Sequence, residues 1–364
     1  MSDKEESTAE AGNEPAVHSG NSRLLRSLTW PLLAFAALIA FNFFFTPNFF
    51  HIEIRDGRLF GSLIDVMNRG APVVLLAMGM TLVIATGGID LSVGAIMAIT
   101  GAMAAGLIAR PPYSWLSAVD MHGIIPLIIV VSLMVSVGAG AWNGLLVSRL
   151  GIQPIVATLI LMVAGRGIAQ LITNGQIITF ENPAFEVIGS GFLFHLPVPI
   201  FIALAVMAVA AIATRATALG LFIEAVGNNP TASYYAGISA RRVKMIAYTF
   251  CGLCSGIAGL IIAADIKGAD ANNAGLYMEL DAILAVAIGG TSLAGGRFTL
   301  IGSLIGALLI QTLTTTILTT TIIAKGIPPA VTLVVKAIVV IAVCLLQSER
   351  FRALFAKRGG RKSS

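Results

Sequence analysis

Long apolar runs separated by short polar segments cover most of this chain. A bilayer core of about 30 Å needs roughly 20 apolar residues per helix, and 17–25 are common. That length predicts ten membrane-crossing helices, at 28–46, 71–86, 91–109, 124–146, 154–172, 197–214, 245–264, 281–294, 299–323 and 331–347. Several runs are short, and those flanking Gly87-Gly88 and Gly295-Gly296 nearly touch. They are either complete helices joined by tight turns or broken half-helices, and the pattern favours neither.

One short stretch, Gly87-Gly88-Ile89-Asp90-Leu91-Ser92, breaks the apolar pattern with a carboxylate and helix-breaking glycines. A carboxylate at the centre of a membrane helix costs roughly 2.5–3.5 kcal/mol by insertion scales. It persists only where it faces protein, water or a pathway. Asp90 is also placed to cap a helix beginning at Leu91, where it would meet the positive end of the helix dipole. We expect a capping or gating role at a break between two spans.

Composition agrees with a membrane protein. Hydrophobic residues make up 57% of the chain and charged residues 11%, about half the usual charged share of a soluble domain. The 38 glycines suit helices that pack closely in lipid. Cys251 and Cys254 have a C-x-x-C spacing but lie in an apolar helical run, so we interpret them as packing residues rather than a redox or metal site. The expected fold is all-α and integral to the membrane, with no metal.

Charge along the chain predicts its topology. Residues 1–27 form a predicted disordered cytoplasmic tail, 28–348 the transmembrane domain and 349–364 a basic cytoplasmic tail. With both termini inside, the basic residues of 215–244 and the C-terminal tail face the cytoplasm, as the positive-inside rule requires. The arginines of 47–70 fall outside, and we expect an amphipathic segment there on the outer surface.

A weak internal sequence similarity predicts a repeat. Residues 89–96, which begin Ile89-Asp90, resemble 280–286, which begin Leu280-Asp281. They open the third and eighth predicted helices, which are equivalent positions in a 5+5 inverted repeat. Transporters built this way place the substrate path where the two halves meet.

The longest polar segment inside the transmembrane domain is the predicted cytoplasmic loop 217–244. Asn229 suits a helix N-cap, Pro230 the first helical position and Gly237 the residue beyond the end. These signals predict a helix of about two turns. An ordinary surface turn is the alternative. A compact helix on a cytosolic loop is also what a permease needs to dock on a separate motor subunit, because it transmits a push that a loose loop would absorb.

Several motifs together resemble a known family. They are Gly87-Gly88-Ile89-Asp90-Leu91-Ser92-Val93-Gly94, Gln153-Pro154-Ile155-Val156-Ala157-Thr158-Leu159, the loop 224–237, Glu279-Leu280-Asp281-Ala282-Ile283 and Gly289-Gly290-Thr291-Ser292-Leu293-Ala294-Gly295-Gly296. In this order, over roughly 28–350, they look like the ribose/galactose-type permeases of bacterial ABC sugar importers. Segments 56–62 and 269–276 look most like the galactofuranose importer permeases of that family.

The resemblance implies a type II-like ABC importer permease in the bacterial inner membrane, a passive subunit rather than an enzyme. Two copies, or this chain and a related one, would form the pathway, and a periplasmic sugar-binding protein would deliver the substrate. Cytoplasmic ATPase subunits would dock on the coupling loop, at Glu224, Ala225, Gly227, Asn229, Pro230 and Gly237. The chain has no G-x-x-x-x-G-K-[ST] phosphate loop, so ATP would be bound by the partner and no cofactor by this subunit.

Polar residues within the spans are the remaining candidates. Gating or helix-break candidates are Gly87, Gly88, Asp90, Ser92, Asp281, Gly295 and Gly296. Pathway candidates are Asn68, Trp142, Asn143, Arg166, Gln170, Glu279 and Gln311, since amides and an aromatic face suit a neutral sugar. Arg166 is the natural counter-ion of Asp90. Pairing among the charges and hydrogen bonding between helices are the alternative uses.

Two other functions compete with the ABC permease. An ion-coupled secondary transporter would use Asp90 and Asp281 as proton or sodium sites. A membrane-embedded enzyme would need a catalytic cluster at an aqueous boundary, and the four histidines are scattered over the tail and loops. The sequence leaves open which sugar is carried, and whether the pore is a homodimer.

Overall fold

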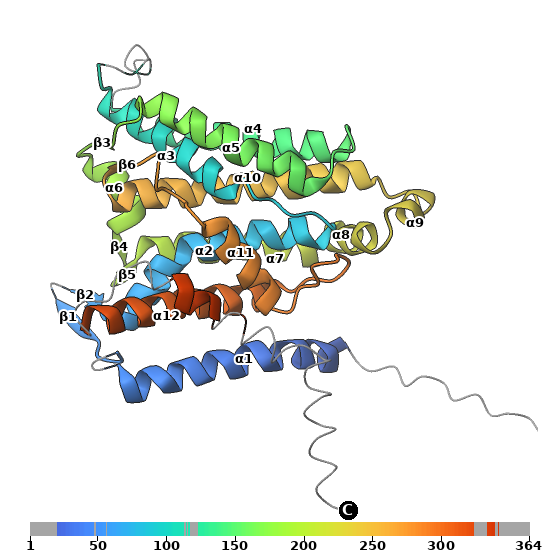
Figure 1. Cartoon of the computed structure of the whole chain (residues 1–364), viewed down its shortest axis with the longest axis horizontal. Helices are drawn as coiled ribbons and strands as arrows, with labels where there is room; N and C mark the ends of the chain where they lie inside the picture. Colours follow the sequence, from blue (N-terminus) through green and yellow to red (C-terminus); the bar gives the residue numbers. More distant parts are fainter. Residues whose placement is uncertain are drawn as a thin grey trace, which may run out of the picture.

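The computed structural model describes residues 20–46, 49–55, 57–112, 114, 116, 123–323, 333–338 and 341. Within these residues it is a bundle of helices, and every strand is two or three residues long. Short hairpins lie at one end of the bundle and two short helices at the other (Figure 1). We call these the hairpin end and the α9 end.

Seven helices of the described residues are long and apolar enough to cross a membrane. They are α1 (Gly20–Phe45), α2 (Ser62–Ala85), α4 (Ile125–Ser148), α5 (Pro154–Thr173), α7 (Val198–Arg215), α10 (Ala240–Asp265) and α12 (Leu300–Ile323). The predicted all-α membrane class is confirmed. Of the ten predicted spans, 331–347 lies largely outside the described residues, as does the tail 349–364.

The other two predicted spans are shorter helices. At 1.5 Å per residue, α3 (Val93–Ala109) reaches about 25 Å and α11 (Met278–Ile288) about 16 Å, against a hydrocarbon core of about 30 Å. The structure therefore decides the question that the sequence left open. The run predicted at 281–294 is a half-helix, and both short helices end or begin at glycine-containing turns. Gly87, Gly295 and Gly296 all have positive φ angles there, near +80° to +89°.

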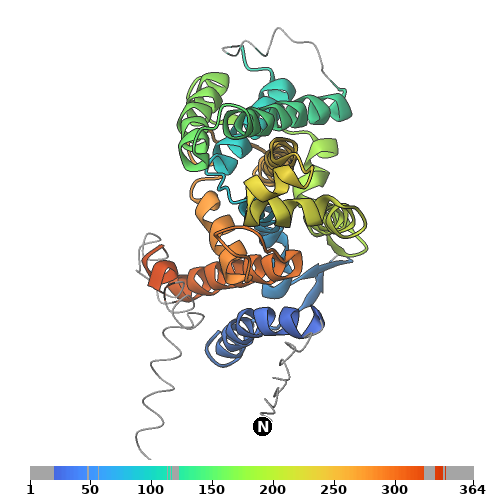
Figure 2. The ribbon, with the colours of Figure 1, turned by 90° about the vertical axis from the view of Figure 1, so that its right-hand side faces the viewer.

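The centre of the bundle is α2. From Gly70 to Ala85 every residue is buried, and this part is apolar on all sides, as a helix segment surrounded by protein must be. It packs against α10, α12, α7 and α11. In turn α10 contacts α4 and α3 on its other side. Figure 2 shows α1 at the edge of the bundle beside α12, where buried Asn42 donates a hydrogen bond of 2.8 Å to Thr316.

The hairpin end is built from paired short strands. There β1 (Glu53–Arg55) pairs with β2 (Arg58–Phe60), and β4 (Phe192–Leu193) with β5 (Leu196–Pro197). The third pair joins distant segments, β3 (Ile178–Thr179) and β6 (Gly268–Ala269). A short helix, α6 (Pro183–Ser190), lies beside them. The amphipathic surface segment expected at 47–70 stays a prediction; its described part includes the β1–β2 hairpin and the first turns of α2.

Two helices make the opposite end, α8 (Leu219–Asn228) and α9 (Pro230–Tyr235). The predicted two-turn helix starting at Pro230 is confirmed, but the loop 217–244 also contains α8 and the start of α10 at Ala240. The predicted disordered tail 1–27 is wrong for its last eight residues, because α1 begins at Gly20 and not at Leu28. Residues 1–19 lie outside the described part of the chain.

Candidate functional site

The carboxylate of Asp90 lies buried in the turn between α2 and α3. Its Oδ1 accepts hydrogen bonds from the Ser92 backbone nitrogen (2.9 Å) and hydroxyl (2.6 Å) and from Asn143 Nδ2 of α4 (3.3 Å). Helix α3 begins at Val93, two residues later than the predicted start at Leu91. The carboxylate therefore lies at the positive end of that helix. Asn143 Nδ2 also donates to Ser92 Oγ at 2.8 Å, which ties the break to α4.

Two more buried polar atoms lie around this break. Tyr248 of α10 is fully buried, and its hydroxyl lies where a side chain on Gly88 would be. Neither Tyr248 Oη nor Asn143 Oδ1 has a hydrogen-bond partner among the described residues. The thiol of Cys251 is adjacent to the carboxylate as well. Buried unpaired polar atoms cost free energy, and such groups need an explanation in a native structure.

Arg166 is not the counter-ion of Asp90, so that prediction is wrong. Its Nη1 donates to the carbonyl oxygens of Ala271 (3.1 Å) and Ala274 (2.6 Å), and Glu279 is the carboxylate that acts on it most strongly. One turn later on α5, Gln170 donates to Asn272 at 2.7 Å. These two pathway candidates therefore hold the loop before α11, and neither reaches the α2–α3 break.

Asp281 forms an ion pair that the sequence interpretation missed. Its Oδ2 lies 2.6 Å from Lys336 Nζ, with both side chains largely buried. Asp281 is the fourth residue of α11, whereas Asp90 precedes α3. The two aspartates of the similar segments therefore occupy different positions relative to their helices. The inverted repeat stays a prediction. The sequence did contain a signal for this ion pair: Lys336 is the single lysine in the apolar run 331–347, and a charge at membrane depth needs a partner.

Trp142 and Asn143 are adjacent on α4 but lie on different faces of the helix. Asn143 is buried at the α2–α3 break, whereas Trp142 is about half exposed on the outside of the bundle. Trp142 therefore lines neither the break nor the cleft described next.

A cleft of about 510 Å³ opens between α2, α10 and α12, with α6 and α11 contributing one residue each. It brings together two pathway candidates that are far apart in the sequence, Asn68 and Gln311. Further polar lining residues, missed by the sequence interpretation, include Asp65, Arg69, Asp265 and Thr315. Asp65 also lines a second hollow of about 340 Å³ among the residues of the β1–β2 hairpin. The cleft and this second hollow thus share Asp65 as a lining residue at the hairpin end.

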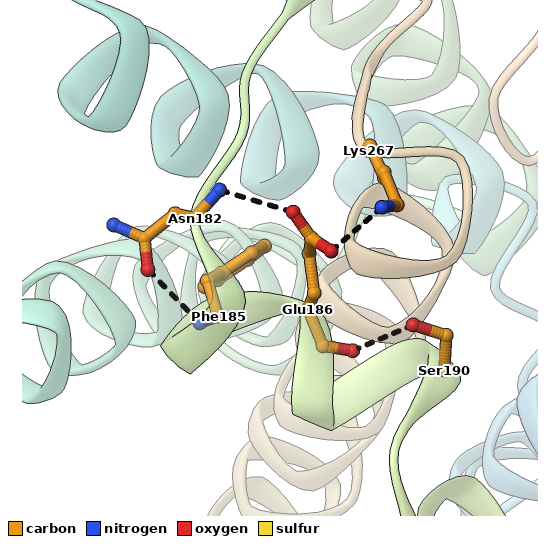
Figure 3. Close-up of polar contacts among 5 residues, drawn as sticks. All are labelled: Asn182, Phe185, Glu186, Ser190 and Lys267. Carbon is orange, nitrogen blue, oxygen red and sulfur yellow. Dashed lines mark hydrogen bonds and ion pairs between the residues drawn. The ribbon is translucent and has the colours of Figure 1, made fainter.

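A small polar cluster joins α6 to the α10–α11 loop (Figure 3), and Gly189 of α6 lines the cleft. Asn182 caps α6 by accepting from the Phe185 backbone nitrogen, and Glu186 Oε1 accepts from the Asn182 nitrogen in return. Glu186 Oε2 also pairs with Lys267 Nζ at 2.7 Å, across to the α10–α11 loop. That hydrogen bond lowers the pKa of Glu186 and raises the pKa of Lys267. Gly189 then packs against the backbone at the end of α10.

At the other end, α9 is a capped and exposed helix. Asn229 Oδ1 accepts from the backbone nitrogens of Thr231 and Ala232, each at 3.0 Å. Gly237, with φ +80°, follows the helix as predicted. Tyr234 and Tyr235 are 73% and 84% exposed. The sequence interpretation missed both tyrosines, although two adjacent aromatic residues in a polar loop were a visible signal.

Four glycines join this end to both helix breaks. A Cβ on Gly227 of α8 would overlap the Ala85 carbonyl oxygen and the Gly296 nitrogen. A Cβ on Gly295 would lie 3.0 Å from both Gly227 O and Gly87 N. We call Gly87, Gly227 and Gly295-Gly296 the glycine junction. Burial raises the pKa of Glu224 on α8, and the positive charge of Arg297 beside the junction opposes that rise.

Comparison with known proteins identifies relatives along nearly the whole chain. The family model described as "Branched-chain amino acid transport system / permease component" matches residues 62–344. The chain is 52% identical to the galactofuranose transporter permease protein YtfT of Escherichia coli, over 90% of this chain and 93% of the relative. It is 37% identical to the fructose import permease protein FruF of Bifidobacterium longum (94% and 95% covered) and 33% to the E. coli ribose import permease protein RbsC (88% and 93%). No solved structure matches.

Proposed function

We propose that this chain, which belongs to the family described as "Branched-chain amino acid transport system / permease component", is the membrane-spanning permease subunit of an ABC importer. The proposed substrate is a monosaccharide. The family description names amino acids, but the three relatives that align over most of their length are named for sugars. Identity of 52% over 90% of the chain is the more specific guide, so galactofuranose is the proposed sugar.

The observation that carries the proposed mechanism is the glycine junction. The exposed helix α9 follows directly on α8, and α8 packs at Gly227 against the turns that end α2 and precede α12. A rigid push on α9 is therefore delivered to both helix breaks without an intervening flexible loop. Hydrolysis of ATP by a docked partner would in this way reach the membrane-embedded half of the protein.

The two ends of the bundle have different proposed partners. The α9 end carries Arg215, Arg241, Arg242, Lys244 and Arg297, so by the positive-inside rule we propose that it faces the cytoplasm, as both termini would. There an ABC ATPase subunit would bind Tyr234 and Tyr235, since exposed aromatic residues are frequent anchors of interfaces. The hairpin end would face the periplasm of the inner membrane, where a sugar-binding protein docks. A second copy of the permease would complete the pathway.

The ion-coupled alternative is less well supported. One of its two proposed ion sites is already paired, because Asp281 Oδ2 lies 2.6 Å from Lys336 Nζ. At the other, Asp90 Oδ1 receives three hydrogen bonds, whereas Oδ2 has no partner among the described residues. The relatives are also named as permeases of import systems.

Uptake by cells tests the proposal. In a strain lacking its own galactofuranose import, we expect expression of this chain with its ATPase and binding protein to restore uptake of labelled galactofuranose. Uptake should persist when an uncoupler dissipates the proton gradient and stop when ATP is depleted. Uptake that an uncoupler abolishes at normal ATP levels would favour the ion-coupled reading.

A further inference from the structure

We propose that Arg166 is a positioning residue, which holds the non-helical segment 266–277 of the membrane domain in place beside α5. The polar face that this segment shares with α5 borders the aqueous pathway between two permease copies, in the outer half of the membrane. This inference rests on the proposed function and adds to it the residue that shapes one wall of the pathway.

The segment 266–277 enters the membrane domain without forming a helix. It leaves the hairpin end at β6, which pairs with β3, and reaches α11 in the middle of the bundle (Figure 1). Since α11 spans only about 16 Å of a hydrocarbon core of about 30 Å, and then leads into the turn before α12, this segment crosses the other half. Non-helical backbone at that depth is tolerated only where it is buried in protein or lines a water-filled cavity.

Two charged side chains supply hydrogen bonds that a helix would otherwise make within its own backbone. Arg166 Nη1 donates to the carbonyl oxygens of Ala271 and Ala274, at 3.1 and 2.6 Å. Asp270 Oδ1 accepts from two backbone nitrogens of the segment, at 3.0 and 3.2 Å. The two charges also act on each other. Removing the guanidinium therefore leaves both carbonyls without this donor and frees one side of the segment.

The exposed face of α5 changes character along the helix. Leu159 and Val163 make its first half apolar. Arg166 and Gln170 continue the same stripe, at intervals of three and four residues. Gln170 donates to Asn272 at 2.7 Å, and both amides are exposed. Exposed amides at membrane depth need water or protein around them, so this end of the stripe does not face lipid.

The segment also contacts the start of α3. Gly275 and Gly94 pack backbone to backbone, and a Cβ on either would overlap the carbonyl oxygen of the other. A Cβ on Gly94 would also meet Glu279 Oε2 of α11, and the charge of Glu279 acts on Arg166. A movement of α11 is therefore passed both to the segment that Arg166 holds and to the start of α3.

Thiol labelling tests which way the polar face turns. In right-side-out vesicles that contain the assembled transporter, Gln170→Cys and Asn273→Cys should react with a membrane-impermeant methanethiosulfonate about tenfold faster than Leu171→Cys, because a thiol ionises readily only in water. Leu171 is the matched control, since it is 78% exposed and one residue nearer the end of α5, on a different face. Cys251 and Cys254 are buried, and the parent chain gives the background. Equal rates at all three positions would overturn the aqueous assignment.

Labelling of a buried position tests whether Arg166 holds the segment. Ala271 is 2% exposed, so Ala271→Cys should label slowly in the parent background and about tenfold faster once Arg166→Ala releases the segment. Arg166→Lys should keep the labelling slow, since an ammonium can also donate to two carbonyls. Arg149→Ala, at the end of α4 nearest α9, is the matched control. Unchanged labelling of Ala271→Cys after Arg166→Ala would overturn the positioning role.

Transport distinguishes positioning from a general loss of the fold. In proteoliposomes with the ATPase and ATP, Arg166→Ala should lower the maximal sugar uptake about tenfold while ATP hydrolysis continues. The concentration of loaded binding protein at half-maximal uptake should not change, because Arg166 lies about 10 Å inside the end of α5. Parent uptake by Arg166→Ala, beside an active parent transporter, would overturn the inference and leave the proposed function intact.

Discussion

The backbone nitrogen of Gly296 donates a hydrogen bond of 3.0 Å to the carbonyl oxygen of Ala85. This single bond joins the last turn of α2 to the turn before α12, although 211 positions separate the residues. Gly227 of α8 packs against both partners. The bond therefore marks the place where the proposed docking helix, through α8, meets the two interruptions of the membrane helices.

A methyl group at Gly227 should uncouple the transporter. In Gly227→Ala the new Cβ overlaps the Ala85 carbonyl, so α8 must shift at an overpacking cost of about 1–3 kcal/mol. We expect sugar uptake to fall severalfold while ATP hydrolysis continues, measured together in proteoliposomes. Gly138→Ala is the control, since that helical glycine has open space around it and alanine favours helices. Equal losses in both variants would contradict a specific role of the junction.

The exposed tyrosines of α9 should anchor the ATPase subunit. Truncation of an aromatic interface anchor costs about 2 kcal/mol, or roughly thirtyfold in affinity. Tyr234→Ala and Tyr235→Ala should therefore weaken copurification of the ATPase with the detergent-solubilised chain. Phe194→Ala, equally exposed but at the hairpin end, should not. If all three variants retain the ATPase, another surface makes the contact.

Replacing the buried carboxylate at the α2–α3 break should impair transport. In Asp90→Asn, the three donors from Ser92 and Asn143 meet either the NH₂ group, which cannot accept, or a neutral carbonyl oxygen, which accepts more weakly than a carboxylate. In both cases the break is held less firmly. We expect slower uptake at unchanged sugar affinity of the isolated binding protein. Uptake at the parent rate would show that the charge is dispensable.

The ion pair between Asp281 and Lys336 should behave as a unit. Removing one partner of a buried pair costs about 3–5 kcal/mol, whereas replacing both by apolar residues is often neutral. Thermal unfolding in detergent should show a large loss for Asp281→Asn, a similar loss for Lys336→Gln, and recovery in the double variant Asp281→Leu, Lys336→Leu. Additive losses in that double variant would argue against coupling.

The tether of α6 should depend on pH in a defined direction. Glu186 has a lowered pKa, so its contribution is present above its ordinary value of 4.5 and is lost as pH falls through the folded value. Lys267 has a raised pKa, so its contribution is lost only as pH rises above 10.5. After correction for the intrinsic pH dependence of exchange, hydrogen exchange of residues 183–190 should be slow between these limits and accelerate as the pH falls through the folded-state pKa of Glu186. Lys267→Gln should remove that acid dependence, with α2 amides as the internal control.

The sequence predicts individual helices better than it predicts the contacts between them. The α9 helix follows from Asn229, Pro230 and Gly237 because capping is local chemistry. The pairing of Arg166 with Asp90 is wrong because proximity between helices depends on rotation and tilt, which one sequence does not encode. The convergence of Gly227 with Gly296 has no local signal at all. Lys336 did have one, since an isolated charge in an apolar run requires a partner.

Reconstitution from purified parts tests the central claim most directly. Proteoliposomes should contain this chain and its ATPase, with ATP enclosed and sugar-loaded binding protein outside. The account predicts sugar accumulation above the external concentration only when all three proteins and ATP are present. Accumulation by this chain alone, driven by an imposed proton or sodium gradient without ATP, would contradict it.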